Sequence, residues 1–269
     1  MSKNVIASHN VNILGKGNQP LLFAHGLACD QNVWSYITPA FEDEYKIILF
    51  DFIGSGESDL SCYDGEKYAS LKGYAADVLA ICEALNLKDV IFIGHSVSSM
   101  IGLYSAISKP TLFSNLIMIG PSPCYKNEPP YEGGFEKQDI DQLLTVMKED
   151  YTKWVDLFAP MVIGKLNNPD LIDEVKETFC KADPAITYEF AKVALLSDSR
   201  NDLQNLKTNT LLMQLEEDLL APPNVGEHLH KNICNSTLYR MNATGHFPHL
   251  SAPEETISMI KQYLDPAKL

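Results

Sequence analysis

The sequence has too little positive charge for a nucleic-acid-binding protein. It contains 21 Lys and Arg residues against 35 Asp and Glu residues, which gives a net charge of −14 at pH 7. Nucleic-acid backbones and anionic membrane surfaces attract proteins of the opposite sign, so this surplus of acid makes both poor partners. We therefore expect no nucleic acid and no membrane among the partners of this protein.

Long apolar segments and paired cysteines are also missing. No window approaches the roughly 18 uninterrupted apolar residues of a membrane-spanning helix, and the first residues, MSKNVIASHN, carry no apolar signal core. The six cysteines are scattered without a CxxC pair, which indicates reduced thiols rather than a disulfide or zinc framework. These features predict a cytoplasmic protein.

What the chain does contain is a series of short apolar runs. Its 269 residues are 45% hydrophobic, enough to bury a sizeable core. The runs alternate with segments of helical periodicity, a pattern typical of an α/β fold whose mostly parallel sheet carries helices on both faces. The predicted strands lie at residues 21–24, 46–50, 90–94, 116–120, 211–214 and 236–241.

The stretch between Cys124 and Ser197 interrupts this alternation. A loop rich in proline and glycine opens it, and helical patterns follow, separated by Asn-Asn-Pro at 167–169 and Asp-Pro at 183–184. We interpret it as a cap of four helices inserted between the sixth and seventh strands. The predicted domains are a cap at residues 125–196 and a core made of residues 1–124 and 197–269.

The apolar face of these helices needs a surface to cover. Above the carboxyl ends of parallel strands, where α/β enzymes bind ligands, it would roof a mostly apolar pocket. Most of its side chains can equally serve to pack one helix on another. The residues expected to line the pocket are Phe135, Trp154, Phe158 and Leu195.

The segment Gly94-His95-Ser96-Val97-Ser98 connects a predicted strand to a helical pattern. This is the context of a nucleophile elbow, in which a strained turn presents a serine hydroxyl at the top of the sheet. The usual pattern is GxSxG, and Ser98 replaces its last glycine. Because serine is still small, we expect a tolerated departure with some local strain, and we predict Ser96 as the nucleophile.

A nucleophilic serine needs a base, and the base needs an acid that holds its tautomer. Asp218 and His246 both follow predicted strands, in the order Ser, acid, His that this architecture requires. Glu216 and Glu217 are alternative acids, but only Asp218 leads directly into an apolar segment, as a buried carboxylate should. His249 is an alternative base, although a hydrogen bond within its own turn explains it more simply.

Backbone amides must stabilise the developing oxyanion. Val97 offers one N–H at the start of a helix, and Leu27, in the turn His25-Gly26-Leu27, offers the second. We expect no cofactor and no metal. The Gly54-Ser55-Gly56 turn lacks the third glycine of a dinucleotide-binding loop, and His228 and His230 point to different faces of a helix.

Several motifs together resemble the α/β-hydrolase superfamily: DxxGxGxSD at residues 51–59, GHSVS at 94–98, DLLAP at 218–222 and GHFPH at 245–249. The segments 29–34, 120–125, 133–136 and 197–200 are similar to the RsbQ-type subfamily, which includes a bacterial regulator of the sigma-B stress response and the plant karrikin and strigolactone receptors. The resemblance implies a sheet of eight strands, a four-helix cap, a Ser-His-Asp triad and a closed apolar pocket. Leu27 and Leu195 stand where the subfamily carries pocket aromatics, which predicts a wider or differently shaped pocket.

Two function classes follow. The first is a serine hydrolase that cleaves a small apolar ester or lactone, in a signalling role that the resemblance implies. The second is a small-molecule sensor with slow hydrolysis that binds a protein partner, such as the PAS-containing phosphatase implied by the bacterial relatives. A perhydrolase or a carbon–carbon bond hydrolase would use the same triad and stays open. Dehalogenase and epoxide-hydrolase chemistry is excluded, because it requires an aspartate in place of Ser96.

Overall fold

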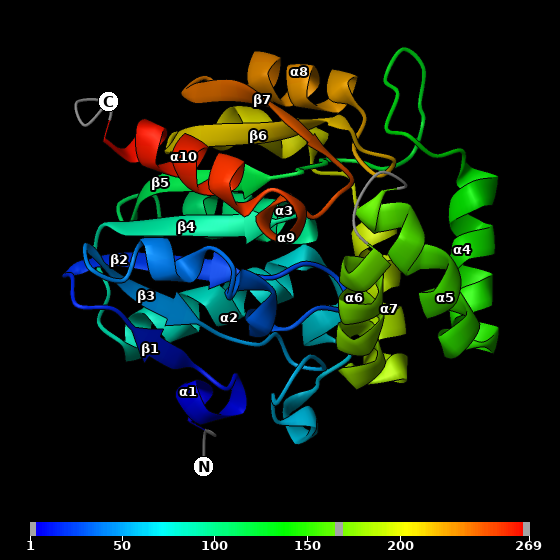
Figure 1. The fold of residues 1–269 in the computed structure, drawn as a ribbon, viewed down its shortest axis with the longest axis horizontal. Helices are drawn as coiled ribbons and strands as arrows, with labels where there is room; N and C mark the ends of the chain where they lie inside the picture. The colour runs from blue at the N-terminus through cyan, green and yellow to red at the C-terminus, as the bar shows by residue number, and fades with distance from the viewer. Residues whose placement is uncertain (1–3, 165–168, 266–269) are drawn as a thin grey trace.

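The strands form a single twisted sheet in the computed structural model, which describes residues 4–164 and 169–265 (Figure 1). Within these residues the sheet has seven strands in the order β1-β3-β2-β4-β5-β6-β7. β1 is antiparallel to β3, and every other neighbouring pair is parallel. The strands are β1 Asn12–Leu14, β2 Gln19–Ala24, β3 Tyr45–Leu49, β4 Val90–His95, β5 Phe113–Ile119, β6 Asn209–Glu217 and β7 Ser236–Thr244. The predicted α/β fold with a mostly parallel sheet is confirmed.

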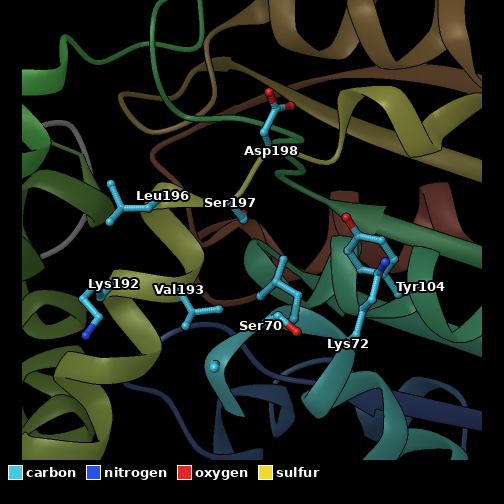
Figure 2. Close-up of a pocket in the computed structure, with 10 residues that line it drawn as sticks. Ser70, Lys72, Tyr104, Lys192, Val193, Leu196, Ser197 and Asp198 are labelled. Carbon is cyan, nitrogen blue, oxygen red and sulfur yellow. The ribbon is translucent and has the colours of Figure 1, made fainter. Parts of the chain in front are cut away.

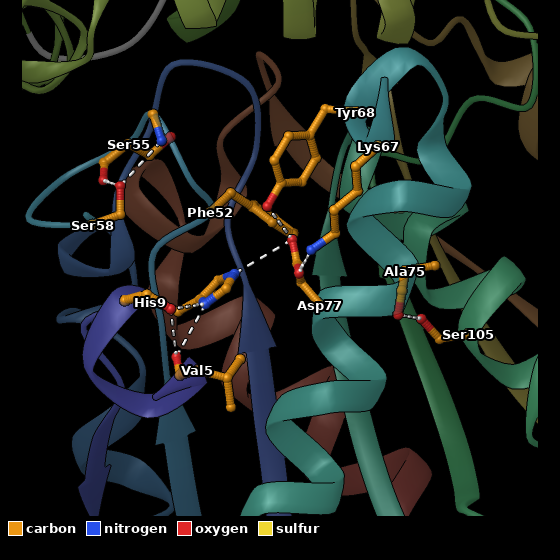
Figure 3. Close-up of polar contacts among 12 residues, drawn as sticks. Val5, His9, Phe52, Ser55, Ser58, Lys67, Tyr68, Ala75, Asp77 and Ser105 are labelled. Carbon is orange, nitrogen blue, oxygen red and sulfur yellow. Dashed lines mark hydrogen bonds and ion pairs between the residues drawn. The ribbon is translucent and has the colours of Figure 1, made fainter. Parts of the chain in front are cut away.

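The described residues form seven strands, one fewer than the eight that the family resemblance implies. Ahead of β1, the described chain forms a short helix, α1 Val5–Ser8, whose first turn is capped by the side chain of Asn4. His9 then anchors this helix: its Nδ1 lies 3.0 Å from the carbonyl oxygen of Val5 and its Nε2 lies 3.3 Å from the Asp77 carboxylate (Figure 3). This polar anchor holds the N-terminal segment against α2 Leu71–Ala84 instead of along the sheet.

Helices cover both faces of the sheet, as predicted. Successive strand side chains point to opposite faces, so Leu21 and Phe23 of β2 pack in one apolar cluster with Ile260, while Leu22 packs in a second cluster with Val78. Figure 1 shows α10, which carries Ile260, crossing the near face of the sheet. The remaining core helices are α3 Val97–Ser108, α8 Pro223–Asn232, α9 Pro248–Ser251 and α10 Pro253–Leu264, and short 3-10 turns lie at Gln31–Trp34, Thr38–Ala40, Leu60–Cys62, Lys67–Ala69 and Arg200–Asn205.

Four helices follow one another between β5 and β6 and gather at the carboxyl ends of the strands (Figure 1). They are α4 Lys137–Glu149, α5 Tyr151–Ile163, α6 Pro169–Lys181 and α7 Pro184–Leu196. Asp150 caps α5 and Asp183 caps α7 through side-chain oxygens that accept backbone N–H groups, which explains why the chain turns there. The helices therefore follow the fifth strand of seven instead of the sixth. The division into a core and a cap at residues 125 and 196 stays a prediction.

One predicted break between cap helices lies partly outside the described residues. Of the Asn-Asn-Pro separator at 167–169, the two asparagines lie outside the described residues, and α6 begins at Pro169.

Across the described part of the chain, no helix has both the length and the apolar character needed to cross a membrane.

Candidate active site

Ser96 occupies a sharp turn between the last residue of β4 and the first residue of α3. Its backbone has φ 57° and ψ −124°, a combination that L-residues rarely adopt, so the turn holds local strain. A Cβ at Gly94 would lie 2.7 Å from the carbonyl oxygen of Ser98, which shows how closely strand and helix cross here. The predicted elbow geometry is present, and the Ser96 hydroxyl lies 3.4 Å from the Tyr125 hydroxyl.

Asp218 and His246 meet at the ends of β6 and β7. His246 Nδ1 lies 2.6 Å from Asp218 Oδ2, and the other carboxylate oxygen accepts the Leu220 N–H at 2.8 Å. The Asp218 side chain is fully buried, whereas Glu216 and Glu217 are exposed. The geometry thus pairs His246 with Asp218 rather than with either neighbouring glutamate.

The second nitrogen of His246 is available for chemistry. Nε2 is buried and has no hydrogen-bond partner among the described residues, while His246 and Ser96 line the same cavity. A carboxylate accepts only, so Nδ1 carries the proton toward Asp218 and a neutral ring leaves Nε2 as an acceptor. The three residues predicted as a triad are therefore brought together, with the Ser96 hydroxyl turned toward Tyr125 in this resting arrangement.

His249 lies too deep to act as the base. Its ring is completely buried, 4.6 Å from the ring of Trp34 and 4.6 Å from that of His95 between centroids. Burial lowers the pKa of His249 to about 3, with a smaller contribution from His246. Neither ring nitrogen has a hydrogen-bond partner in the described part of the chain, so the expectation of a hydrogen bond within its own turn is wrong.

The two residues predicted as oxyanion donors line the same cavity as Ser96. Val97 is the first residue of α3, and Leu27 lies in the loop after β2; both line the cavity that contains Ser96. Within residues 4–164 and 169–265, neither of their N–H groups donates to another backbone or side-chain acceptor. Both amides are thus free to meet a carbonyl oxygen.

The cavity at Ser96 is small, with a volume of about 30 Å³. Phe158 and Leu195 line it as expected, but Phe135 and Trp154 do not. Trp154 stacks behind Phe158 at 4.8 Å between ring centroids, and Phe135 pairs its backbone with Tyr125. The Trp154 ring therefore lies behind that of Phe158, and the Phe135 side chain is a partly buried residue packed against the same apolar cluster.

Several lining residues escaped the sequence analysis. The loop before α4 carries Tyr125, and the cap helices carry Val162, Phe179 and Ala194. Two more, Leu220 and Phe247, lie within two residues of Asp218 and His246 in the sequence. Aromatic side chains of Tyr125, Phe179 and Phe247 thus line the cavity together with Leu27 and Leu195. Adjacency to Asp218 and His246 was the signal that could have identified Leu220 and Phe247.

Two buried groups near Ser96 stay neutral. Burial raises the pKa of Tyr125 to about 12, so its hydroxyl keeps its proton beside Ser96. Burial, helped by His249 and His246, holds the pKa of His95 well below the usual range. The neutral His95 ring donates from Nε2 to the carbonyl oxygen of His246 at 2.8 Å, which ties the elbow to the loop of the base.

Another hollow, of about 380 Å³, does not include Ser96 in its lining. Figure 2 shows it between the start of α2, Tyr104 of α3 and the end of α7, with Lys72 and Lys192 on its walls. None of the three triad candidates lines it. In the described ranges, no three His, Cys, Asp or Glu side chains are grouped so that they could hold a metal ion.

The chain resembles known hydrolases over nearly its whole length. The family model described as alpha/beta hydrolase fold matches residues 19–154. The Karrikin insensitive 2 receptor CA of Petunia hybrida is 38% identical over 258 residues, which cover 96% of both chains, and the strigolactone esterase D14 of Arabidopsis thaliana is 33% identical over 262 residues, 97% of this chain and 98% of the esterase. The structure of a hydrolase from Oleispira antarctica matches with a TM-score of 0.95 at 39% identity, covering 97% of this chain and 96% of that one. The protein belongs to the α/β-hydrolase family.

Proposed function

We propose that the protein is a serine hydrolase that cleaves a small apolar ester or lactone. The observation that carries the proposal is the buried contact of 2.6 Å between His246 Nδ1 and Asp218, in a site where His246 and Ser96 line one cavity and Nε2 has no partner among the described residues. A serine, an imidazole and a buried carboxylate are the groups that this kind of acyl transfer requires.

In the proposed reaction, the Ser96 side chain rotates from Tyr125 toward His246, and Nε2 takes the hydroxyl proton as Oγ attacks the carbonyl carbon. Hydrogen bonds of this kind are often long in a resting enzyme and shorten when substrate is bound. His246 then gives the proton to the leaving alcohol, leaving an acyl group on Ser96. A water molecule, activated by the same nitrogen, releases the acid. Asp218 stabilises the imidazolium in each half-reaction and keeps its charge.

The Leu27 and Val97 amides supply the oxyanion hole in this proposal. Both are free of other partners among the described residues, and Val97 also stands at the positive end of the α3 dipole. Amides that are already oriented stabilise the oxyanion more than the ground-state carbonyl, because the oxyanion carries the larger negative charge.

The lining favours an apolar substrate of small size. Its side chains are mostly aliphatic or aromatic, and the Tyr125 hydroxyl is the polar group that the cap side adds. A cavity of about 30 Å³ holds far less than the several hundred cubic ångströms of a usual ligand pocket. Substrate entry therefore requires that side chains of α5 and α7, such as Phe158 and Leu195, move outward.

A second candidate is a small-molecule sensor that hydrolyses slowly and binds a protein partner. The small volume of the cavity favours it, because a ligand that enters must displace side chains of the cap helices. Relatives named as karrikin receptors and as strigolactone esterases support both candidates. In this proposal the protein is of the RsbQ type, and a regulatory phosphatase is the kind of partner implied.

The two candidates are separated by turnover. We expect the purified protein to hydrolyse p-nitrophenyl acetate and a butenolide lactone, with an acyl adduct on Ser96 visible by intact mass. Turnover of many cycles per second supports the hydrolase. A single slow turnover, combined with ligand-dependent binding of a partner protein, supports the sensor. Hydrolysis that is unchanged in Ser96→Ala would refute both mechanisms.

A further inference from the structure

The residue that departs from the usual elbow pattern makes an unusual contact. Ser98 stands where GxSxG has glycine, and its side chain is fully buried. Its hydroxyl donates to the carbonyl oxygen of His25 at 2.5 Å, across 73 residues of sequence. A need for a small residue would not require a hydroxyl at this position. The hydrogen bond therefore indicates that the hydroxyl has a role beyond its small size.

The acceptor belongs to the loop that carries one proposed oxyanion donor. His25 precedes Gly26 and Leu27, and the loop then turns sharply: Ala28 has φ 59°, and the Cys29 N–H donates to the Gly26 carbonyl at 3.3 Å. A non-glycine residue at positive φ is strained and persists only where surrounding contacts hold it. The direction of the Leu27 N–H therefore depends on how firmly this loop is fixed.

The ring of His25 fixes one side of the loop. Its Nδ1 donates to the Gly26 carbonyl at 2.8 Å, and its Nε2 accepts the N–H of Phe52 at 3.1 Å. The elbow fixes the other side, where a Cβ at Gly26 would lie only 2.6 Å from the ring of His95. The bond from Ser98 to the His25 carbonyl is a polar link between the elbow and this loop.

We propose that Ser98 is a positioning residue for the oxyanion hole. Ser98 follows Val97, the donor on the elbow, and its hydroxyl holds the residue two positions before Leu27, the donor on the loop. This hydrogen bond therefore contributes to the spacing between the two amides, in addition to the contacts of the His25 ring. The inference rests on the proposed function, because it concerns the geometry of that reaction.

Misplacement of an oxyanion donor is costly. Removing one donor slows enzymes by about 100-fold to 1,000-fold, and a shift of about 1 Å in a reacting group can cost about 100-fold. Loss of the Ser98 hydroxyl leaves Leu27 in place but loosens it. We therefore expect a fall in kcat of about tenfold, with KM changed less than about twofold, because the amides bind the oxyanion more strongly than the substrate.

The test compares Ser98→Ala and Ser98→Gly with wild type, and with Ser105→Ala as a matched control. Ser105 is a fully buried serine of the same helix whose hydroxyl donates to the Ile101 carbonyl at 2.9 Å, remote from the oxyanion loop. The readouts are kcat and KM for p-nitrophenyl acetate, the affinity for phenylboronic acid, and Tm. The boronate forms a tetrahedral adduct on Ser96, so its affinity reports the oxyanion hole without turnover.

We expect both Ser98 variants to lose kcat and boronate affinity by about the same factor, while Ser105→Ala keeps both. Ser98→Gly is decisive, because it restores the common pattern: if Ser98 is only a tolerated small residue, this variant is as fast as wild type or faster, and the inference is wrong. A loss of Tm without a loss of boronate affinity would also overturn it. A wild-type protein that neither hydrolyses the ester nor binds the boronate overturns the proposed function itself.

Discussion

Replacing Asp218 by asparagine changes one atom and, through it, the tautomer of His246. Of the two oxygens of Asp218, one accepts the Leu220 N–H at 2.8 Å and the other accepts His246 Nδ1 at 2.6 Å. In Asp218→Asn the amide oxygen has to face the Leu220 N–H, because an NH2 group there would oppose another donor. The amide NH2 group then faces His246 Nδ1.

This orientation forces the imidazole proton onto the wrong nitrogen. With a donor opposite Nδ1, the neutral ring carries its proton on Nε2 and points it at Ser96, where it cannot accept the hydroxyl proton. The corresponding change in a well-studied Ser-His-Asp protease lowers kcat about 10⁴-fold, which corresponds to about 5.5 kcal/mol of transition-state stabilisation. We expect a fall in kcat of about 10³-fold to 10⁴-fold here, with a small change in KM.

The assay is steady-state hydrolysis of p-nitrophenyl acetate, with Glu217→Gln as the matched control. Glu217 is the exposed carboxylate next to Asp218, so its neutralisation should change kcat less than about twofold. Near-ultraviolet circular dichroism checks that both variants keep the native fold. The reasoning is refuted if Asp218→Asn stays within tenfold of wild type, or if Glu217→Gln is the more damaging of the two.

Two further predictions concern the cavity and the buried histidines. Leu195→Ala should enlarge the cavity, raising kcat/KM for butyrate relative to acetate esters by about tenfold or more while lowering the free energy of unfolding by about 2–5 kcal/mol, measured by urea denaturation; an unchanged substrate ratio would show that Leu195 does not limit the pocket. Burial lowers the folded-state pKa of His249 to about 3, so the neutral ring stabilises the fold above the unfolded pKa of about 6.5, and this contribution is lost as pH falls from about 6.5 toward 3. The loss of Tm between pH 8 and pH 4 should therefore be smaller in His249→Phe, and an equal loss in both proteins would contradict the assignment.

The strands β2 to β7 and the triad candidates were predictable because each has a local signal, whereas the short, exposed strand β1 was missed. Apolar runs such as residues 90–94 and 116–120 are buried on both faces, and their continuity shows directly in the sequence. Ser96, Asp218 and His246 each follow such a run, and parallel strands bring their carboxyl ends to one edge of the sheet. The order of these residues and their positions at strand ends were therefore enough to predict that they lie near one another.

Features that depend on tertiary contacts were not predictable. Trp154 and Phe158 are four residues apart on one face of α5, yet only Phe158 lines the cavity, because periodicity identifies a face and not the depth of each side chain. The eighth strand was expected from the family resemblance. The N-terminal segment instead forms a helix, and the contact that accompanies this helix joins His9 to Asp77, which are far apart in the sequence. Likewise, the size of Ser98 was readable from the sequence, but its bond to His25 was not.

The central claim is that Ser96 is the nucleophile. The most direct test is intact-mass spectrometry of wild type and Ser96→Ala after exposure to a fluorophosphonate, followed by peptide mapping of the adduct. Wild type should gain one adduct, located on Ser96, and should lose its esterase activity in proportion, while Ser96→Ala should stay unlabelled and retain its Tm. Labelling of another residue, or esterase activity that persists in fully labelled protein, would contradict the account.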